Sequence, residues 1–169
     1  MRTIKISLSP SSINQAREQL TQEKDWIVDK ARQLAVELAK YGIRVAEKNT
    51  GEYWGKFIEF VMETDETKTG CKAIMIMRDA TKIVPKHDKK AREVSPSLMA
   101  EYGSGKWAVD DWRGTFPEQT HAFDPKGWWY QGEDDKWHHT FGVPPHRPMY
   151  TAYMQMLANI DEVIKRVFV

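Results

Sequence analysis

The segment at residues 101–112, EYGSGKWAVDDW, has the spacing that most resembles a chemical site, a glycine-rich turn followed by a lysine. A phosphate-binding loop needs G-x-x-x-x-G-K-[S/T], because its backbone N–H groups wrap the phosphates and its hydroxyl binds magnesium. Here Ala100 stands where the first glycine is required, and Trp107 stands in place of the hydroxyl residue. The paired aspartates that follow would repel a phosphate. We therefore interpret Gly103 and Gly105 as a structural turn in which one glycine has a positive φ.

The histidines are the next candidates for chemistry. His138 and His139 are adjacent, so on a strand they point to opposite faces and cannot share a metal ion. A fold could gather Asp134 and Asp135 with His121, but a turn with acidic residues at its tip is the more ordinary structure. There is no H-x-x-x-H, no pair of cysteines and no G-x-S-x-G. The residues therefore predict no metal, no cofactor and no enzymatic activity.

Five of the seven tryptophans cluster in one third of the chain, where they allow a second interpretation: Trp107, Trp112, Trp128, Trp129 and Trp137. Exposed rings stack on sugars or on unpaired bases, so a binding module for carbohydrate or single-stranded nucleic acid is the alternative function. Alternation along a strand places Trp129 on one face and its neighbours on the other, which predicts one buried row and one row available to a partner. For any individual ring we expect a place in the core.

Composition and charge exclude several classes of protein. The net charge of +1 over 169 residues gives no global attraction to nucleic acid or to a membrane. The lone Cys71 cannot form an internal disulfide and lies in an apolar run, so we expect a reducing compartment and an inert thiol. The N-terminus alternates apolar and polar residues, unlike a signal peptide, and no run of about 18 apolar residues predicts a membrane span. We expect a soluble intracellular protein.

The first half of the chain predicts a strand, a long helix and a hairpin. Alternation over residues 4–8 indicates the strand, and Ser12 with Gln15 fits a capping box at the start of the helix. A helical stripe follows, with a stop predicted near residues 49–51: Ile13, Leu20, Ile27, Ala31, Leu34, Leu38, Tyr41 and Val45. Its heptad spacing is compatible with a coiled coil, but we favour a long helix packed across a sheet. Two apolar runs around the ETKTG turn predict the hairpin, with a central strand over residues 73–77.

The second half predicts loops between short elements. A long basic loop near residues 80–97 contains Lys86, Lys89, Lys90 and Arg92, which could touch a phosphate backbone but more commonly form a solvated surface. A short strand over residues 97–103 leads into a Trp-rich insertion near 104–127, and a hairpin follows with its turn at residues 132–135. The last helix begins at Pro148, where the missing amide hydrogen is tolerated. Its predicted buried face is Met149, Tyr153, Met156, Ile160, Ile164 and Val167.

These elements together predict one domain over residues 1–169, of α+β class. We expect a mostly antiparallel, twisted sheet packed against the long N-terminal helix and the C-terminal helix.

The order of these parts resembles the tail-component family of lambda-like siphophages, small proteins that complete the tail or join it to the head. The family has an F/Y-G-T/S-G element at the end of a strand, which Tyr102, Gly103, Ser104 and Gly105 match. It also has a P-x-R-P-M/F-Y element at the start of the last helix. The residues matching this second element are Pro145, Arg147, Pro148, Met149 and Tyr150. A D-T-G-x-L segment found in many members is replaced here by NTGEYWGKF.

The resemblance implies a structural virion protein that acts in tail completion or head–tail joining, with no cofactor. It would lie in the tail or neck of the virion, and in the host cytoplasm during assembly. Its partners would be other tail or neck proteins and further copies of itself, with a ring as one form of the oligomer. No membrane and no specific nucleic-acid recognition are implied.

Overall fold

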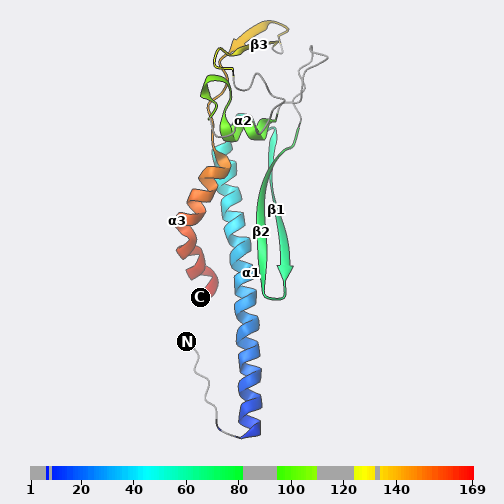
Figure 1. Cartoon of the computed structure of the whole chain (residues 1–169), viewed down its shortest axis with the longest axis vertical. Helices are drawn as coiled ribbons and strands as arrows, with labels where there is room; N and C mark the ends of the chain where they lie inside the picture. Colours follow the sequence, from blue (N-terminus) through cyan, green and yellow to red (C-terminus); the bar gives the residue numbers. More distant parts are fainter. Residues whose placement is uncertain (1–6, 8, 82–94, 110–123, 132–133) are drawn as a thin grey trace.

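A computed structural model describes residues 7, 9–81, 95–109, 124–131 and 134–169. Several sequence-based predictions lie wholly or mostly outside these residues: the strand over 4–8, the basic cluster of the loop near 80–97, and most of the Trp-rich insertion. Figure 1 shows an elongated molecule built around one long helix, with the other elements gathered along its upper half. No helix in the described part of the chain is long and apolar enough to span a bilayer.

The long helix, α1 (Pro10–Trp54), has 45 residues, and its N-cap lies three residues before the predicted one at Ser12. Ser9 is the N-cap, and its hydroxyl accepts a hydrogen bond from the Ser12 amide at 3.3 Å, so the predicted Ser12–Gln15 box is wrong. Pro10 fits the first turn because its missing amide hydrogen has no helical partner there. The predicted stop near residues 49–51 appears as a kink at Gly51, with φ of 79°, and the helix continues to Trp54.

The predicted first hairpin is confirmed. β1 (Ile58–Thr67) pairs antiparallel with β2 (Gly70–Asp79), from Ile58 opposite Asp79 to Thr67 opposite Gly70. The prediction of a central strand is wrong, because among the described strands β2 pairs only with β1. Its apolar residues are partly buried instead because the hairpin lies along α1 (Figure 1).

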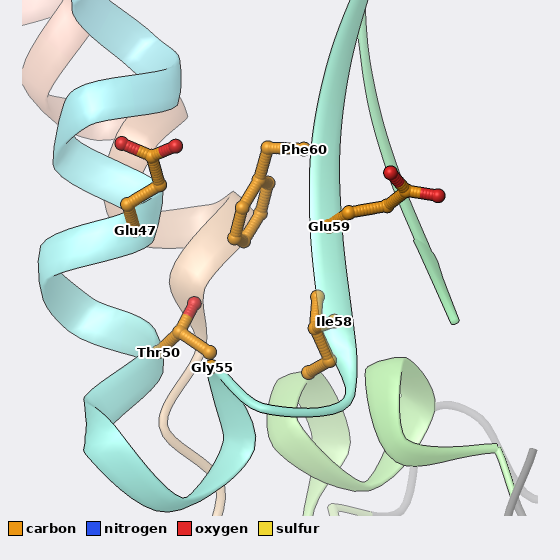
Figure 2. Close-up of a pocket in the computed structure, with 6 residues that line it drawn as sticks. All are labelled: Glu47, Thr50, Gly55, Ile58, Glu59 and Phe60. Carbon is orange, nitrogen blue, oxygen red and sulfur yellow. The ribbon is translucent and has the colours of Figure 1, made fainter. Parts of the chain in front are cut away.

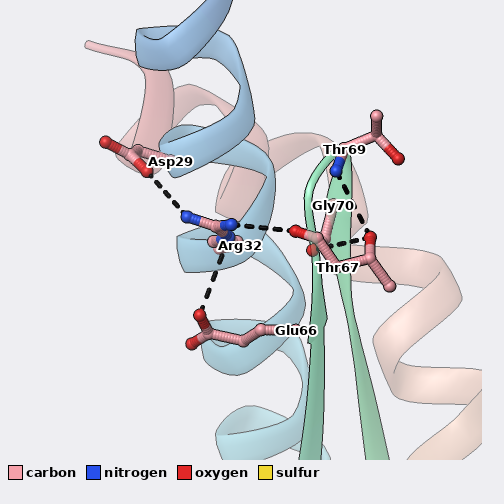
Figure 3. A network of polar contacts seen from close by, with 6 residues as sticks. All are labelled: Asp29, Arg32, Glu66, Thr67, Thr69 and Gly70. Carbon is pink, nitrogen blue, oxygen red and sulfur yellow. Dashed lines mark hydrogen bonds and ion pairs between the residues drawn. The ribbon is translucent and has the colours of Figure 1, made fainter.

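Arg32 of α1 holds the tip of this hairpin (Figure 3). Its guanidinium donates to the Thr67 carbonyl at 2.9 Å and to Asp29 at 3.1 Å. Its Nε lies 3.8 Å from Glu66, an ion-pair distance that is too long for a hydrogen bond. This cation therefore ties α1 to the tip of the hairpin through the Thr67 carbonyl and Glu66, while Asp29 of α1 holds the guanidinium from its own helix.

The C-terminal helix, α3 (Pro148–Phe168), packs against α1, and Pro148 is at its first turn as predicted. Gly42 permits the close approach, since a Cβ there would lie 2.6 Å from Met156 Sδ of α3 and 3.1 Å from Met75 Sδ of β2. At the far end, the rings of Trp26 and Phe168 meet edge to face with centroids 5.9 Å apart. Beyond the C-terminal end of α3, α1 continues without another of the described helices or strands beside it (Figure 1).

The predicted buried face of α3 is half right: Val167 is buried and Met149 and Met156 are partly buried, but the other three predicted residues are exposed. The buried residues are Pro148, Ala152, Val163 and Val167, whereas Tyr153 is 54% exposed and Ile160 and Ile164 are each 36% exposed. Met156 lies beside Gly42, and Ala152 is fully buried. The exposed large apolar residues of α3 form its outer face: Tyr150, Tyr153, Met154, Leu157, Ile160 and Ile164.

The strand predicted over residues 97–103 is a helix, α2 (Pro96–Tyr102). Ser95 and Pro96 form its N-cap and first position, which is a helix-start signal rather than a break. Asp79 at the end of β2 fixes this start, because its carboxylate accepts from the Ser95 hydroxyl and the Ser97 amide, each at 2.7 Å. Local capping therefore decides the conformation of this segment.

A small apolar core joins the upper ends of these elements: Trp54, Ile58 and Ala100, with Phe60, Met77, Met99 and Val143 packed around them. A short 3₁₀ helix, η1 (Gly105–Trp107), follows α2. The predicted second hairpin is confirmed as β3 (Trp128–Gln131) paired antiparallel with β4 (Trp137–Thr140). The class is α+β as predicted, with its antiparallel strands in two separate two-stranded sheets.

Candidate functional site

The two segments that carry the family resemblance pack against each other. The Ala100 carbonyl accepts from the amides of His146 and Arg147, at 2.8 and 3.1 Å. Ser104 binds Val143 twice, since its amide donates to the Val143 carbonyl at 2.8 Å and its hydroxyl accepts from the Val143 amide at 3.1 Å. We call this unit, residues 100–107 with residues 141–150, the α2–α3 junction.

Glu101 fixes the start of α3 in the junction. Its carboxylate accepts from the Met149 amide at 2.8 Å and from the Tyr150 amide at 3.0 Å, and its residue is only 8% exposed. The first amides of a helix lack partners within the helix and carry partial positive charge, so a carboxylate stabilises them. No local sequence signal identifies this role, because Glu101 caps a helix that begins far along the chain.

Both glycines of the turn have positive φ, 74° at Gly103 and 62° at Gly105, so the prediction of one such glycine is exceeded. A Cβ on Gly103 would lie 2.9 Å from Pro145 Cδ and from the Val143 carbonyl oxygen. A Cβ on Gly105 would collide with the Phe141 carbonyl. The glycines therefore serve both the backbone conformation and the close approach of the two segments.

The amides of this turn donate within the protein rather than to a phosphate. Gly103 donates to Met99, Ser104 to Val143 and Lys106 to Phe141, at 2.9, 2.8 and 3.0 Å. The Lys106 ammonium lies over two rings, 4.5 Å from the centroid of Trp107 and 5.4 Å from that of Phe141. The arrangement agrees with a structural turn.

The remaining residues of the two matched elements occupy defined places in the junction. The Tyr102 carbonyl accepts from the Val109 amide at 3.0 Å. Arg147 has a left-handed conformation with φ of 53°, and its guanidinium lies 5.8 Å from the ring of Tyr150. Pro148 is buried, while Tyr150 is 52% exposed. The junction thus has a packed interior and a surface that carries a tyrosine.

Trp129 lies outside the junction hydrogen bonds, on an exposed aromatic face. Pairing and alternation along β3 and β4 put Trp129, Trp137 and His139 on one side of the hairpin. His139 contacts both Trp129 and Phe141, with centroids 5.1 and 4.8 Å apart. Through Phe141 this face reaches Lys106, so we define the aromatic face as Trp129, Trp137, His139, Phe141, Lys106 and Trp107.

The expectation of a core position for each ring is wrong for this face. Trp129 and Trp137 are each 64% exposed and Trp107 is 48% exposed, whereas Trp54 is buried. Trp128, on the opposite side of the hairpin from Trp129, is partly buried, but Tyr130 in the same row is 47% exposed, so the prediction of one buried row is wrong. Trp112 lies outside the described residues.

The acidic turn of the second hairpin forms a pair rather than a metal site. His138 Nε2 lies 2.8 Å from Asp134 Oδ1, and this hydrogen bond is the main cause that lowers the pKa of Asp134 below its ordinary value. Among the residues that the structure describes, no group of three His, Cys, Asp or Glu side chains is placed to hold a metal ion. His121 lies outside them.

A depression of about 330 Å³ lies between the end of α1 and the start of β1 (Figure 2). Among its described lining residues, the ionisable ones are Glu47 and Glu59. Figure 2 shows Phe60 pointing toward α1 while Glu59 points away on the other face of the strand. The depression therefore gathers no pair of groups for acid–base chemistry.

The fold is that of an α+β protein with two exposed faces, the aromatic face and the apolar outer face of α3, on either side of the hydrogen-bonded α2–α3 junction. No family model matches the chain, and comparison with curated proteins and with solved structures finds no similar one.

Proposed function

We propose that this chain is a structural virion protein of a tailed bacteriophage, acting in tail completion or head–tail joining through protein–protein contacts. The observation that supports the proposal is the α2–α3 junction, because the segments that contain the two short elements of the family resemblance, far apart in the sequence, are hydrogen-bonded to each other there. A junction in which Glu101 caps α3 sets the angle of a helix with an apolar outer face. Such faces are suited to contacts with other proteins.

The proposed role places the protein in the tail or neck of the virion, and in the host cytoplasm during assembly. Its partners are other tail or neck proteins and copies of itself. It uses no enzymatic activity and no cofactor.

Disruption of the coding sequence in the phage that encodes the chain tests this role. We expect electron microscopy of the lysate to show heads and tails that are unjoined or incomplete, and we expect the chain supplied in trans to restore infectious particles. Normal particles and an unchanged titre without the chain would overturn the proposal. So would a gene that lies apart from those for portal, capsid and tape-measure proteins.

The aromatic face supports a second candidate, a module that binds carbohydrate or single-stranded nucleic acid. Trp129 and Trp137 are largely exposed, and Lys106 supplies a cation beside Phe141. Titration of tryptophan fluorescence with oligosaccharides and oligonucleotides at physiological salt separates the candidates, and we expect no saturable change. A saturable shift lost in Trp129→Ala and retained in Trp26→Ala, an exposed tryptophan on α1, would favour the binding module.

A further inference from the structure

Two exposed apolar faces of this molecule have matching geometry. The first is the N-terminal stripe of α1, in which Ile13, Leu20 and Ile27 are 43%, 56% and 54% exposed. Leu34 and Tyr41 continue the same heptad series and are partly buried, in the upper half of α1 where α3 and the hairpin lie alongside it (Figure 1). The stripe is therefore the part of one helical face that the described helices and strands leave uncovered.

The second face is the outer face of α3. Along its centre Tyr150, Leu157 and Ile164 are 52%, 50% and 36% exposed. Each face thus has three large apolar residues at intervals of seven, the spacing that keeps a seam facing a partner helix. Because each series covers fourteen residue steps, both extend about 21 Å at 1.5 Å per residue.

Charge decides how these faces pair. Arg17 lies four residues after Ile13, and Asp161 lies four residues after Leu157, so each stands on the same side of its own stripe. Antiparallel helices bring equal sides of their stripes together, whereas parallel helices bring opposite sides together. An antiparallel pairing that places Ile13 against Ile164 therefore brings Arg17 beside Asp161.

The same rule disfavours pairing of either face with itself. Two antiparallel N-terminal stripes that meet at Leu20 would bring Arg17 beside Lys24, a pair of like charges. Two outer faces of α3 that meet at Leu157 would bring Asp161 beside Met154, which offers no opposite charge. Of the three combinations, only the mixed one has both apolar and charge complementarity.

We infer that the N-terminal stripe of one copy binds the outer face of α3 of a second copy, with the helices antiparallel. Ile13 packs on Ile164, Leu20 on Leu157 and Ile27 on Tyr150 of the neighbouring copy. Each copy uses one face as donor and the other as acceptor, so the contact is head-to-tail and leaves a free face at each end. Such contacts generate a ring when the rotation closes and a filament when it does not.

This contact deepens the proposed role by naming the surfaces through which the subunit meets copies of itself. The contact depends on the proposed role only for its place in the virion. Self-association itself is a property of the purified chain. We expect this contact to bury less than the roughly 1,200 Å² of surface that a stable complex buries. The associated fraction should therefore rise as the protein concentration increases through the micromolar range.

Mixing two variants tests the contact directly. Leu20→Asp inactivates the stripe and leaves α3 intact, while Leu157→Asp inactivates α3 and leaves the stripe intact. Sedimentation should be measured at a protein concentration on the order of 100 μM, where short contacts of this kind associate. We expect the unchanged chain to form assemblies and each variant alone to remain near 19.7 kDa. An equimolar mixture should form a species of twice that mass and no larger, because only one contact remains possible.

Charge exchange and an off-stripe variant complete the test. Arg17→Asp and Asp161→Arg should each weaken self-association at least tenfold, and the double variant should restore it. Gln22→Asp, on another side of the same half of α1, should associate like the unchanged chain. A monomer at all concentrations, or a mixture that stays monomeric while the unchanged chain associates, would overturn the inference. Either result would leave the phage experiment on tail completion unaffected, so the two failures can be told apart.

Discussion

Replacement of Glu101 by Ala is the sharpest test of the α2–α3 junction. The change removes a carboxylate that accepts from the Met149 and Tyr150 amides at 2.8 and 3.0 Å in a residue that is 8% exposed. Hydrogen bonds to a charged group contribute about 1.5–3 kcal/mol each, but water can reach part of a helix end after truncation. We therefore expect the free energy of unfolding to fall by about 2–4 kcal/mol, within the combined range of a lost cap and a lost charge–dipole interaction.

Urea denaturation followed by circular dichroism measures this change, and the melting temperature gives a second reading. For a chain of this length a loss of about 2–4 kcal/mol corresponds to a decrease of roughly 4–16 °C. Glu162→Ala is the matched control, because Glu162 is an exposed residue of α3, and it should change the unfolding free energy by less than about 0.5 kcal/mol. If Glu101→Ala is no more destabilising than the control, the carboxylate does not hold the start of α3 and our description of the junction fails.

Further predictions concern the glycine turn and α3. Gly105→Ala should destabilise by at least about 1 kcal/mol in urea unfolding, because φ is positive and a carbonyl blocks the Cβ, whereas Gly70→Ala, with no atom within 4 Å, should not. Equal effects would contradict this reasoning. Val163→Ala should cost about 2 kcal/mol and Ile160→Ala about half as much, since the residues are 3% and 36% exposed; the reverse order would mean that α3 packs by its other face. Calorimetry should detect no magnesium-dependent ATP binding, either to the unchanged chain or to Lys106→Ala. Micromolar affinity in the unchanged chain that is lost in Lys106→Ala would restore the phosphate-loop interpretation.

Part of the fold was predictable because its signals are local. Alternation around the ETKTG turn predicted β1 and β2, and Pro148 predicted the start of α3. The class followed from the order of helical and alternating segments. The helix at Pro96 was missed although Ser95 and Pro96 are a local start signal. The carboxylate of Asp79 at the end of β2 reinforces that start, and no pattern within residues 95–102 reveals this partner.

The buried face of α3 shows a second limit. Hydrophobicity selected Tyr153 and Ile160, but these residues are exposed, whereas Ala152 and Val163 are buried. A periodic pattern gives the presence of an apolar face and leaves open which of two apolar faces meets the core. For the candidate site, the sequence supplied Gly103 and Gly105, while Glu101 and the pairing of residues 104 and 143 required the structure.

Quantitative mass spectrometry of purified virions tests the central claim most directly. We expect the chain to be present in particles of the phage that encodes it, in a fixed ratio to the neck or tail proteins. When heads and tails are separated, the chain should remain with the tails or with the neck fragment. Its absence from purified particles, while it is abundant in the lysate that produced them, would contradict a structural role in the virion.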